Sequence, residues 1–192
     1  MNTFDPAGDA NQPFLIVEAA AGSGKTHLLV ERIVALLASG AAPGGILAIS
    51  FTTKAAAELR DRVHQRLHQR VFRIRVIDAY ATSCAICRLR YRSLLDAAHI
   101  LPDGHPRGNP VVPNGLALCK IHHAAYDANY LGVRPDFVVE VRRDVRDAAD
   151  GPMLLHGLQE MAGVSLTLPK TRSARPDPTR LEERYELFRR AS

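Results

Sequence analysis

The sequence predicts an α+β fold in two parts, residues 1–68 and 69–192. Near the front, a glycine-rich turn at 19–26 separates a short apolar run from an amphipathic helix pattern, as in a phosphate-binding α/β unit. Further along, residues 84–127 hold all three cysteines of the chain together with histidines, an asparagine and aspartates. Those side chains are typical of metal sites. We therefore expect a truncated P-loop α/β fragment followed by a metal-containing domain.

The first part begins with an apolar strand at Phe14 that leads into the glycine-rich turn. The turn matches the phosphate-binding loop pattern, except that Ala19 replaces its first glycine. In such loops the amides cradle phosphates, the lysine reaches the β and γ groups, and the threonine contacts Mg²⁺. The residues expected to hold a nucleotide such as ATP are Gly22, Ser23, Gly24, Lys25 and Thr26.

A helix is expected from Thr26 to about Ser39, a second apolar strand over 46–51, and a basic helix to about Arg70. Residues 4–68 resemble motifs I and Ia of UvrD/RecB-type superfamily 1 DNA helicases. The acidic Walker B strand, the arginine finger and the second RecA-like domain of those enzymes have no counterpart in this sequence. The resemblance therefore implies a helicase fragment without ATPase or helicase activity.

Two pairs of residues in the second part have the spacing of metal ligands. Cys84 and Cys87 are separated by two residues, and Cys119 and His122 repeat that spacing. Three thiolates and one imidazole suit a structural, tetrahedral Zn²⁺. The alternative is a set of idle thiols. A disulfide framework is disfavoured, because three cysteines leave one unpaired and no secretory signal precedes them.

Further polar residues lie within this metal-ligand pattern. His99 is expected to end a strand and Asn114 to open the returning segment. Neighbouring residues on a helix point about 100° apart, so His123 should face a different site from His122. Asp127, four residues later, should share the face of His123.

These residues make the stretch from about 70 to 190 resemble an HNH endonuclease with the ββα-metal fold, especially bacterial nucleases related to restriction enzymes. His99, Asn114 and His123 stand in the three name-giving places. The resemblance implies that His99 is the general base, that Asn114 holds its loop, and that His123 binds the catalytic divalent ion, Mg²⁺ or Mn²⁺.

The carboxylate that completes the catalytic ion site is open. Many HNH nucleases have an acidic or histidine ligand immediately before the base, where this chain has Ala98. Asp96 shares a strand face with that position, and Asp127 shares a helix face with His123. Asp96 is slightly preferred. The alternatives are a strand-end hydrogen bond for Asp96 and a solvated surface charge for Asp127.

DNA is the expected partner, in agreement with the net charge of +5. Arg88, Arg90 and Lys120 are candidate phosphate contacts, and their alternative is a solvated surface. One HNH site cuts one strand, so double-strand cutting would need a homodimer or a second event. Without an apolar run of membrane length or a signal peptide, we expect no membrane association and a cytoplasmic location.

The rest of the second part should complete its fold. The metal helix should end over 130–132, an alternating strand should cover 137–141, and a short apolar segment should follow at 153–161. A final helix should begin near Pro178 with Leu181, Tyr185 and Phe188 on one face.

The combined prediction is a P-loop fragment followed by a zinc-containing ββα-metal domain that acts as a metal-dependent DNA endonuclease, with a restriction or defence role. Two alternatives remain open. A zinc-stabilised DNA-binding module without catalysis is favoured by Ala98 at the usual ligand position. A nucleotide-sensing nuclease is favoured by the phosphate-binding loop.

Overall fold

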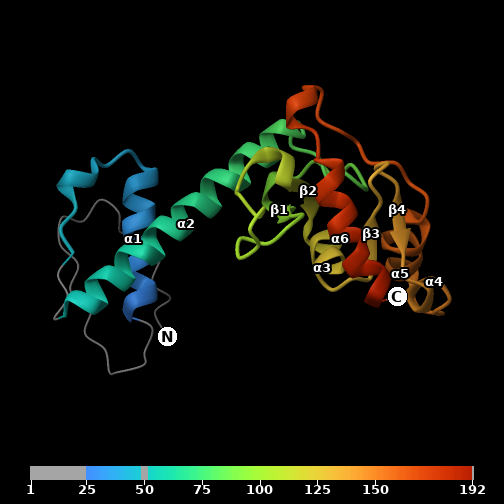
Figure 1. The fold of residues 1–192 in the computed structure, drawn as a ribbon, viewed down its shortest axis with the longest axis horizontal. Coiled ribbons are helices and arrows are strands. Elements are labelled where there is room, and N and C mark those ends of the chain that lie inside the picture. The colour runs from blue at the N-terminus through green and yellow to red at the C-terminus, as the bar shows by residue number, and fades with distance from the viewer. Residues whose placement is uncertain (1–24, 49–51, 192) are drawn as a thin grey trace. The chain divides into compact units, whose positions relative to one another are not determined.

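The computed structural model of the chain describes residues 25–48 and 52–191. The chain divides into two compact units, Met1–Gln69 and Arg70–Ser192, one residue from the expected boundary (Figure 1). Among the helices of the described residues, none has both the length and the apolar character needed to cross a bilayer.

The described part of the first unit consists mainly of helix. It contains α1 (Lys25–Ala38) and the first part of α2 (Thr53–Ala79). An apolar stripe of α1 packs against α2, and the buried members of this cluster are Val30, Ile33, Val34 and Leu59. The strand expected from Phe14 lies outside the described residues. Of the strand expected over 46–51, only 46–48 are described, and these form no strand.

Helix α2 is longer than the expected helix, because its last turns belong to the core of the second unit. It continues to Ala79 instead of ending near Arg70. Phe72, Val76 and Ile77 are almost completely buried there. Their helical spacing is masked in the sequence by interleaved arginines, and burial of this apolar face stabilises the additional turns.

The second unit contains the expected ββα arrangement. Strand β1 (Leu95–His99) pairs antiparallel with β2 (Gly115–Cys119), with His99 opposite Gly115. Helix α3 (Lys120–Asp127) follows β2 without an intervening loop and contacts both strands (Figure 1). This order brings the end of β1, the end of β2 and the start of α3 into one region.

A second hairpin and several helices complete this unit. Strand β3 (Leu131–Val133) pairs antiparallel with β4 (Val139–Val141). The expectation that the metal helix ends over 130–132 was wrong, because α3 ends at Asp127 and Gly132 lies in β3. Burial of Leu131 and Val133 favours extended backbone at this point. The helices after β4 are α4 (Arg143–Arg146), α5 (Pro152–Gly157) and α6 (Pro178–Ala191).

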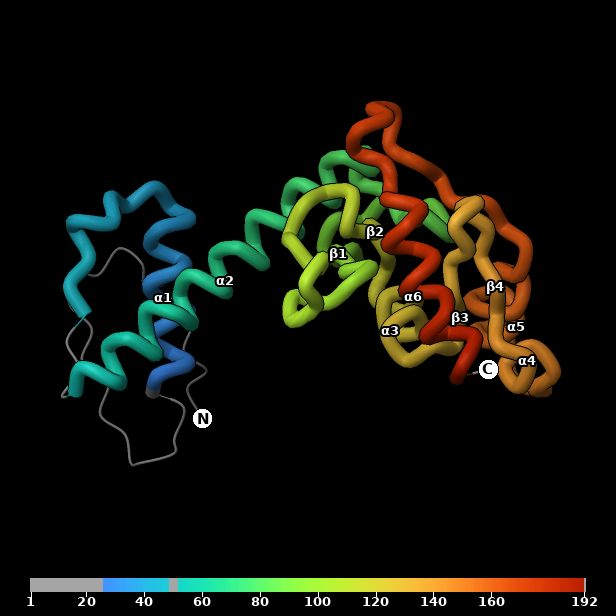
Figure 2. The backbone as a smooth tube through the Cα atoms, in the orientation of Figure 1, coloured from blue at the N-terminus to red at the C-terminus, as the bar shows by residue number. Residues whose placement is uncertain are grey.

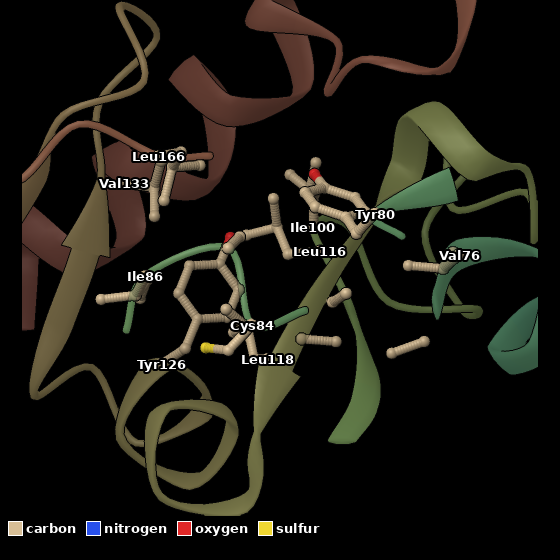
Figure 3. Close-up of a cluster of buried hydrophobic side chains, with 14 of the residues drawn as sticks. Val76, Tyr80, Cys84, Ile86, Ile100, Leu116, Leu118, Tyr126, Val133 and Leu166 are labelled. Atoms are coloured by element: carbon tan, nitrogen blue, oxygen red, sulfur yellow. The ribbon is translucent and has the colours of Figure 1, made fainter. Parts of the chain in front are cut away.

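Helix α6 lies against β3 and seals the core (Figure 2). Leu181 and Phe188 are buried, whereas Tyr185 on the same side is only partly buried. Arg184 lies over the Tyr126 ring, 4.6 Å from its centre, and donates a hydrogen bond to the Tyr126 carbonyl at 2.6 Å. Both strands of the first hairpin and α3 contribute to the apolar core, whose side chains are drawn in Figure 3.

We expect Gly132→Ala to destabilise the protein. A Cβ at this position would lie 2.6 Å from two ring carbons of Phe188, so α6 would have to move away from β3. Overpacking of this kind costs about 1–3 kcal/mol. Urea unfolding followed by far-UV circular dichroism measures the change. Gly104→Ala is the control, because a Cβ there meets no atom within 4 Å. Equal unfolding midpoints for the two variants would contradict the prediction.

Candidate functional site

Four metal-ligating side chains converge where the zinc site was expected. Cys84, Cys87, Cys119 and His122 place one ligand atom each within 4.8 Å of the others. The Cys119 Sγ atom is 3.9 Å from Cys87 Sγ and 3.2 Å from His122 Nδ1. Tetrahedral zinc–ligand bonds would put neighbouring sulfurs about 3.8 Å apart and a sulfur and a nitrogen about 3.5 Å apart. The donor set and its spacing therefore fit a zinc ion.

The imidazole of His122 is oriented from its far side. Its Nε2 atom lies 2.9 Å from the carbonyl oxygen of Gly157 at the end of α5. Donation from Nε2 leaves Nδ1 unprotonated and directed at the thiols. Helix α5 therefore supports the cluster although it contributes no ligand.

His99 is at the end of β1, with its ring half-buried. The ring stacks on Phe72 of α2, with ring centres 4.1 Å apart and ring planes 17° apart. Its Nε2 atom lies 3.2 Å from an Asp103 oxygen. Burial lowers the pKa of His99, and Asp103 opposes this effect. The imidazole is consequently favoured in its neutral form near pH 7.

Asn114 is completely buried and binds the loop that follows β1. Its Oδ1 atom accepts a hydrogen bond from the Leu101 N–H at 3.0 Å, and its Nδ2 atom donates to the Leu101 carbonyl at 2.9 Å. Nδ2 also donates to the Asn109 carbonyl at 3.1 Å. These bonds satisfy buried polar groups on both sides of the loop and fix the backbone next to His99.

His123 is on the opposite side of α3 from the thiol cluster, as the helical spacing predicted. Its Nε2 atom lies 3.2 Å from an Asp127 oxygen, and its Nδ1 atom lies 3.8 Å from an Asp96 oxygen. The Asp127 carboxylate raises the pKa of His123. The charges of His123 and Asp127 also affect the pKa of His99, so the two imidazoles belong to one electrostatic site.

Asp96 is held by two cationic side chains. Arg73 donates from Nε at 3.0 Å and also reaches the Leu95 carbonyl at 2.6 Å. The Lys120 ammonium lies 2.8 Å from the other Asp96 oxygen. Although burial acts in the opposite direction, Lys120 keeps the pKa of Asp96 below its usual value.

The remaining candidates lie on the surface or outside the described residues. Arg88 and Arg90 are exposed next to Cys87, and Lys120 is exposed beyond its contact with Asp96. Among the nucleotide-binding candidates, Gly22, Ser23 and Gly24 lie outside the described residues. Lys25 begins α1, and Thr26 is exposed in its first turn.

Sequence reasoning missed three residues that contact this site. Phe72 and Arg73 lie more than twenty positions before the residues they contact, and no spacing pattern links them. Asp103 follows His99 by four positions in an irregular loop, where no regular periodicity could predict the contact. The signal that was available was the presence of a carboxylate close in sequence to the candidate base.

Comparison with known proteins divides the chain as the motifs did. The family model of the UvrD/REP helicase N-terminal domain matches residues 6–104, just over half of the chain. The HNH endonuclease family model matches residues 84–134. The two matches overlap over 84–104, so the helicase match extends beyond the region 4–68 in which its motifs were found. The overlap includes β1, which the structure pairs with β2.

Curated relatives match a short segment of the chain. ATP-dependent DNA helicase UvrD1 of Mycobacterium tuberculosis is 62% identical over 52 residues, which are 27% of this chain and 7% of the helicase. An ATP-dependent helicase/nuclease of Levilactobacillus brevis is 47% identical over 55 residues, 29% of this chain and 4% of that protein. The chain thus spans less than a tenth of the length of these relatives.

Among solved structures, the modification-dependent TagI restriction endonuclease is similar with a TM-score of 0.40 and 19% identity. The similarity covers 60% of this chain and 36% of TagI. The two family matches together cover the described ββα unit and the segment before it. The chain belongs to the UvrD/REP helicase N-terminal domain family, and it joins that segment to an HNH endonuclease domain.

Proposed function

We propose that the second unit is a metal-dependent endonuclease that hydrolyses phosphodiester bonds of DNA. The observation that carries this proposal is the position of His99 on β1 and His123 on α3, close enough for their charges to interact. Both belong to a ββα unit that matches the HNH endonuclease family. Neither side chain is needed for the thiol cluster, so both are free for chemistry.

In this proposal His99 is the general base. Its pKa is lowered by burial, so the neutral ring can take a proton from an attacking water near pH 7. Asn114 acts on the loop backbone and not on the proton. A divalent ion, Mg²⁺ or Mn²⁺, would neutralise charge on the phosphate and on the departing 3′ oxygen. His123 would hold that ion together with a carboxylate.

Asp127 and Asp96 are the two candidates for that carboxylate, and they approach opposite nitrogens of His123. Asp96 is already paired with Lys120 and Arg73, and a divalent ion would have to displace the Lys120 ammonium. Asp127 is more exposed and pairs only with His123 among the recorded ion pairs of the described residues. These contacts support Asp127, although the strand pattern slightly favoured Asp96.

We also propose that the thiol cluster holds a structural Zn²⁺. Its ligands come from the turn after α2, from β2 and from α3. An ion bound there would tie these three segments together and so hold β2 and α3 under the candidate site.

DNA would be the partner, with Arg88, Arg90 and Lys120 as exposed phosphate contacts beside the site. A cytoplasmic location, a restriction or defence role and a homodimer for double-strand cutting remain proposals. Nucleotide binding by Lys25 and its neighbours is a further proposal, supported by the helicase family match across that segment.

We expect His99→Ala to reduce nicking of supercoiled plasmid DNA by about 10²–10⁴-fold in Mg²⁺ or Mn²⁺, because the general base is lost. Gel analysis of single-turnover reactions measures the rate. His156→Ala is the control, since that exposed histidine pairs with Glu160 of the same segment and lies outside the site. If the parent bound DNA without cutting it in any divalent ion, the zinc-stabilised DNA-binding alternative would replace the nuclease.

We expect about one zinc per chain in the purified protein, and a large loss of zinc in Cys119→Ser because one thiolate ligand is removed. Elemental analysis measures the zinc content, and thermal unfolding should show a lower Tm for the variant. His156→Ala should keep the zinc of the parent. Equal zinc contents in Cys119→Ser and the parent would exclude the proposed cluster.

We expect Lys25→Ala to weaken binding of a fluorescent ATP analogue at least tenfold, since the loop lysine contacts the β and γ phosphates. Titration in the presence of Mg²⁺ measures the Kd. Lys170→Ala, an exposed lysine of the second unit, is the control for charge. Identical titration curves for the parent and Lys25→Ala would argue against the nucleotide-sensing alternative.

A further inference from the structure

Asp103 is a charged residue that the proposed function does not yet use. It lies in the loop between β1 and β2, and its Oδ1 atom is 3.2 Å from Nε2 of His99. The carboxylate is 41% exposed, whereas Nε2 of His99 has almost no accessible surface. The side of the ring that carries Nε2 is therefore closed to water and faces an anion.

The loop holds Asp103 in place from both sides. Before it, the backbone N–H and carbonyl of Leu101 are both bonded to the buried Asn114 side chain. After it, His105 Nε2 lies 2.8 Å from Glu183 of α6, and Arg107 contacts the same carboxylate. Asp103 thus lies between two anchored positions.

Close packing inside the loop restricts it further. A Cβ on Gly108 would lie 1.9 Å from the carbonyl oxygen of Pro102, so the chain returns against the residue that precedes Asp103. The same carbonyl accepts a hydrogen bond from the His105 N–H at 2.8 Å. Such packing keeps the carboxylate near the imidazole.

The His99 ring is restricted as well. Phe72 covers one face of the imidazole, which leaves the ring edge with its two nitrogens for polar contacts. The oxygen of Asp103 is close to Nε2, but it lies off the N–H direction, and no aligned hydrogen bond forms at that atom. Contacts of this kind in a ligand-free site tighten when substrate binds, and a small rotation of the exposed Asp103 side chain would align it.

We propose that Asp103 is a positioning residue that holds the Nε2–H of His99 and thereby leaves Nδ1 as the nitrogen that accepts a proton. A carboxylate favours the tautomer that directs N–H toward it, as in a catalytic triad. The inference rests on the proposed function only for the role of His99 as base. The contact itself is independent of catalysis.

The proton transfer then balances as follows. As the water oxygen attacks phosphorus, one water O–H bond breaks and the proton joins the lone pair of Nδ1. The departing 3′ oxygen leaves with the electron pair of its bond to phosphorus. His99 becomes an imidazolium whose other N–H faces the Asp103 carboxylate, which stabilises the positive charge without taking the proton.

Asp103 could instead be a ligand of the catalytic ion. Within the described residues, the cluster of three or more metal-ligating atoms lying within 4.8 Å of one another is the cysteine and histidine set described above. Asp103 and His99 therefore form a pair without a third such ligand. This arrangement favours positioning over coordination, and the experiment separates the two.

The test is the ring tautomer of His99 in the full, zinc-loaded chain without added Mg²⁺ or Mn²⁺. Long-range ¹H–¹⁵N NMR of protein labelled at its histidines reports which ring nitrogen carries the proton, at a pH where the ring is neutral. His99→Gln assigns the signal. We expect the parent to show protonation at Nε2, Asp103→Ala to show a mixture of tautomers, and Asp103→Glu to restore much of the parent signal.

Plasmid nicking by the same variants gives the second measurement. We expect Asp103→Ala to lower kcat by about ten- to a hundredfold with little change in KM or in the Mn²⁺ concentration needed. The matched control is Asp136→Ala, which removes an exposed carboxylate that faces Arg134 and no histidine. It should retain both the parent tautomer and the parent rate.

Several outcomes would overturn the proposal. One is an unchanged His99 tautomer in Asp103→Ala, and another is a parent ring protonated at Nδ1. A fall in rate that is reversed by excess Mn²⁺, with the tautomer unchanged, would identify Asp103 as a metal ligand. If the parent cuts no DNA, the proposed function fails, but the tautomer measurement still decides whether Asp103 orients His99.

Discussion

The arrangement of the candidate site depends on one buried amide side chain. Asn114 bonds both polar backbone groups of Leu101 and the carbonyl of Asn109, so the long loop after β1 is tied to the start of β2. Breaking this contact would leave several buried polar groups without partners, at a cost of about 1–3 kcal/mol each. Because His99 and Asp103 lie on either side of Leu101, the same bonds set the spacing between them.

A second constraint comes from the thiol cluster on the other side of β2 and α3. Cys119 ends the strand and His122 lies in the first turn of the helix, so the strand-to-helix junction is held at the cluster. The adjacent His123 is then directed toward His99 by the 100° step of the helix. The two sites therefore share one short segment but use opposite sides of it.

Charge around Asp96 links the end of α2 to the same region. Arg73 and Lys120 both bind this carboxylate, and Arg73 also bonds the backbone of β1. Phe72, the residue before Arg73, stacks on His99. The last turns of α2 thus support the site with one apolar and one charged contact, which explains why the helix continues beyond the basic stretch in which it was expected to end.

The sequence by itself determined the local features: the strand that ends at His99, the helix that carries His122 and His123, and the set of metal-ligating residues. Each follows from spacing along one element, where periodicity relates sequence to direction. It also identified the two families that the comparisons matched. The tertiary structure decided the contacts between elements, including Phe72 on His99, Asp103 at Nε2 and α6 against β3. These contacts depend on loop paths and packing between residues distant in sequence, and no local pattern encodes them.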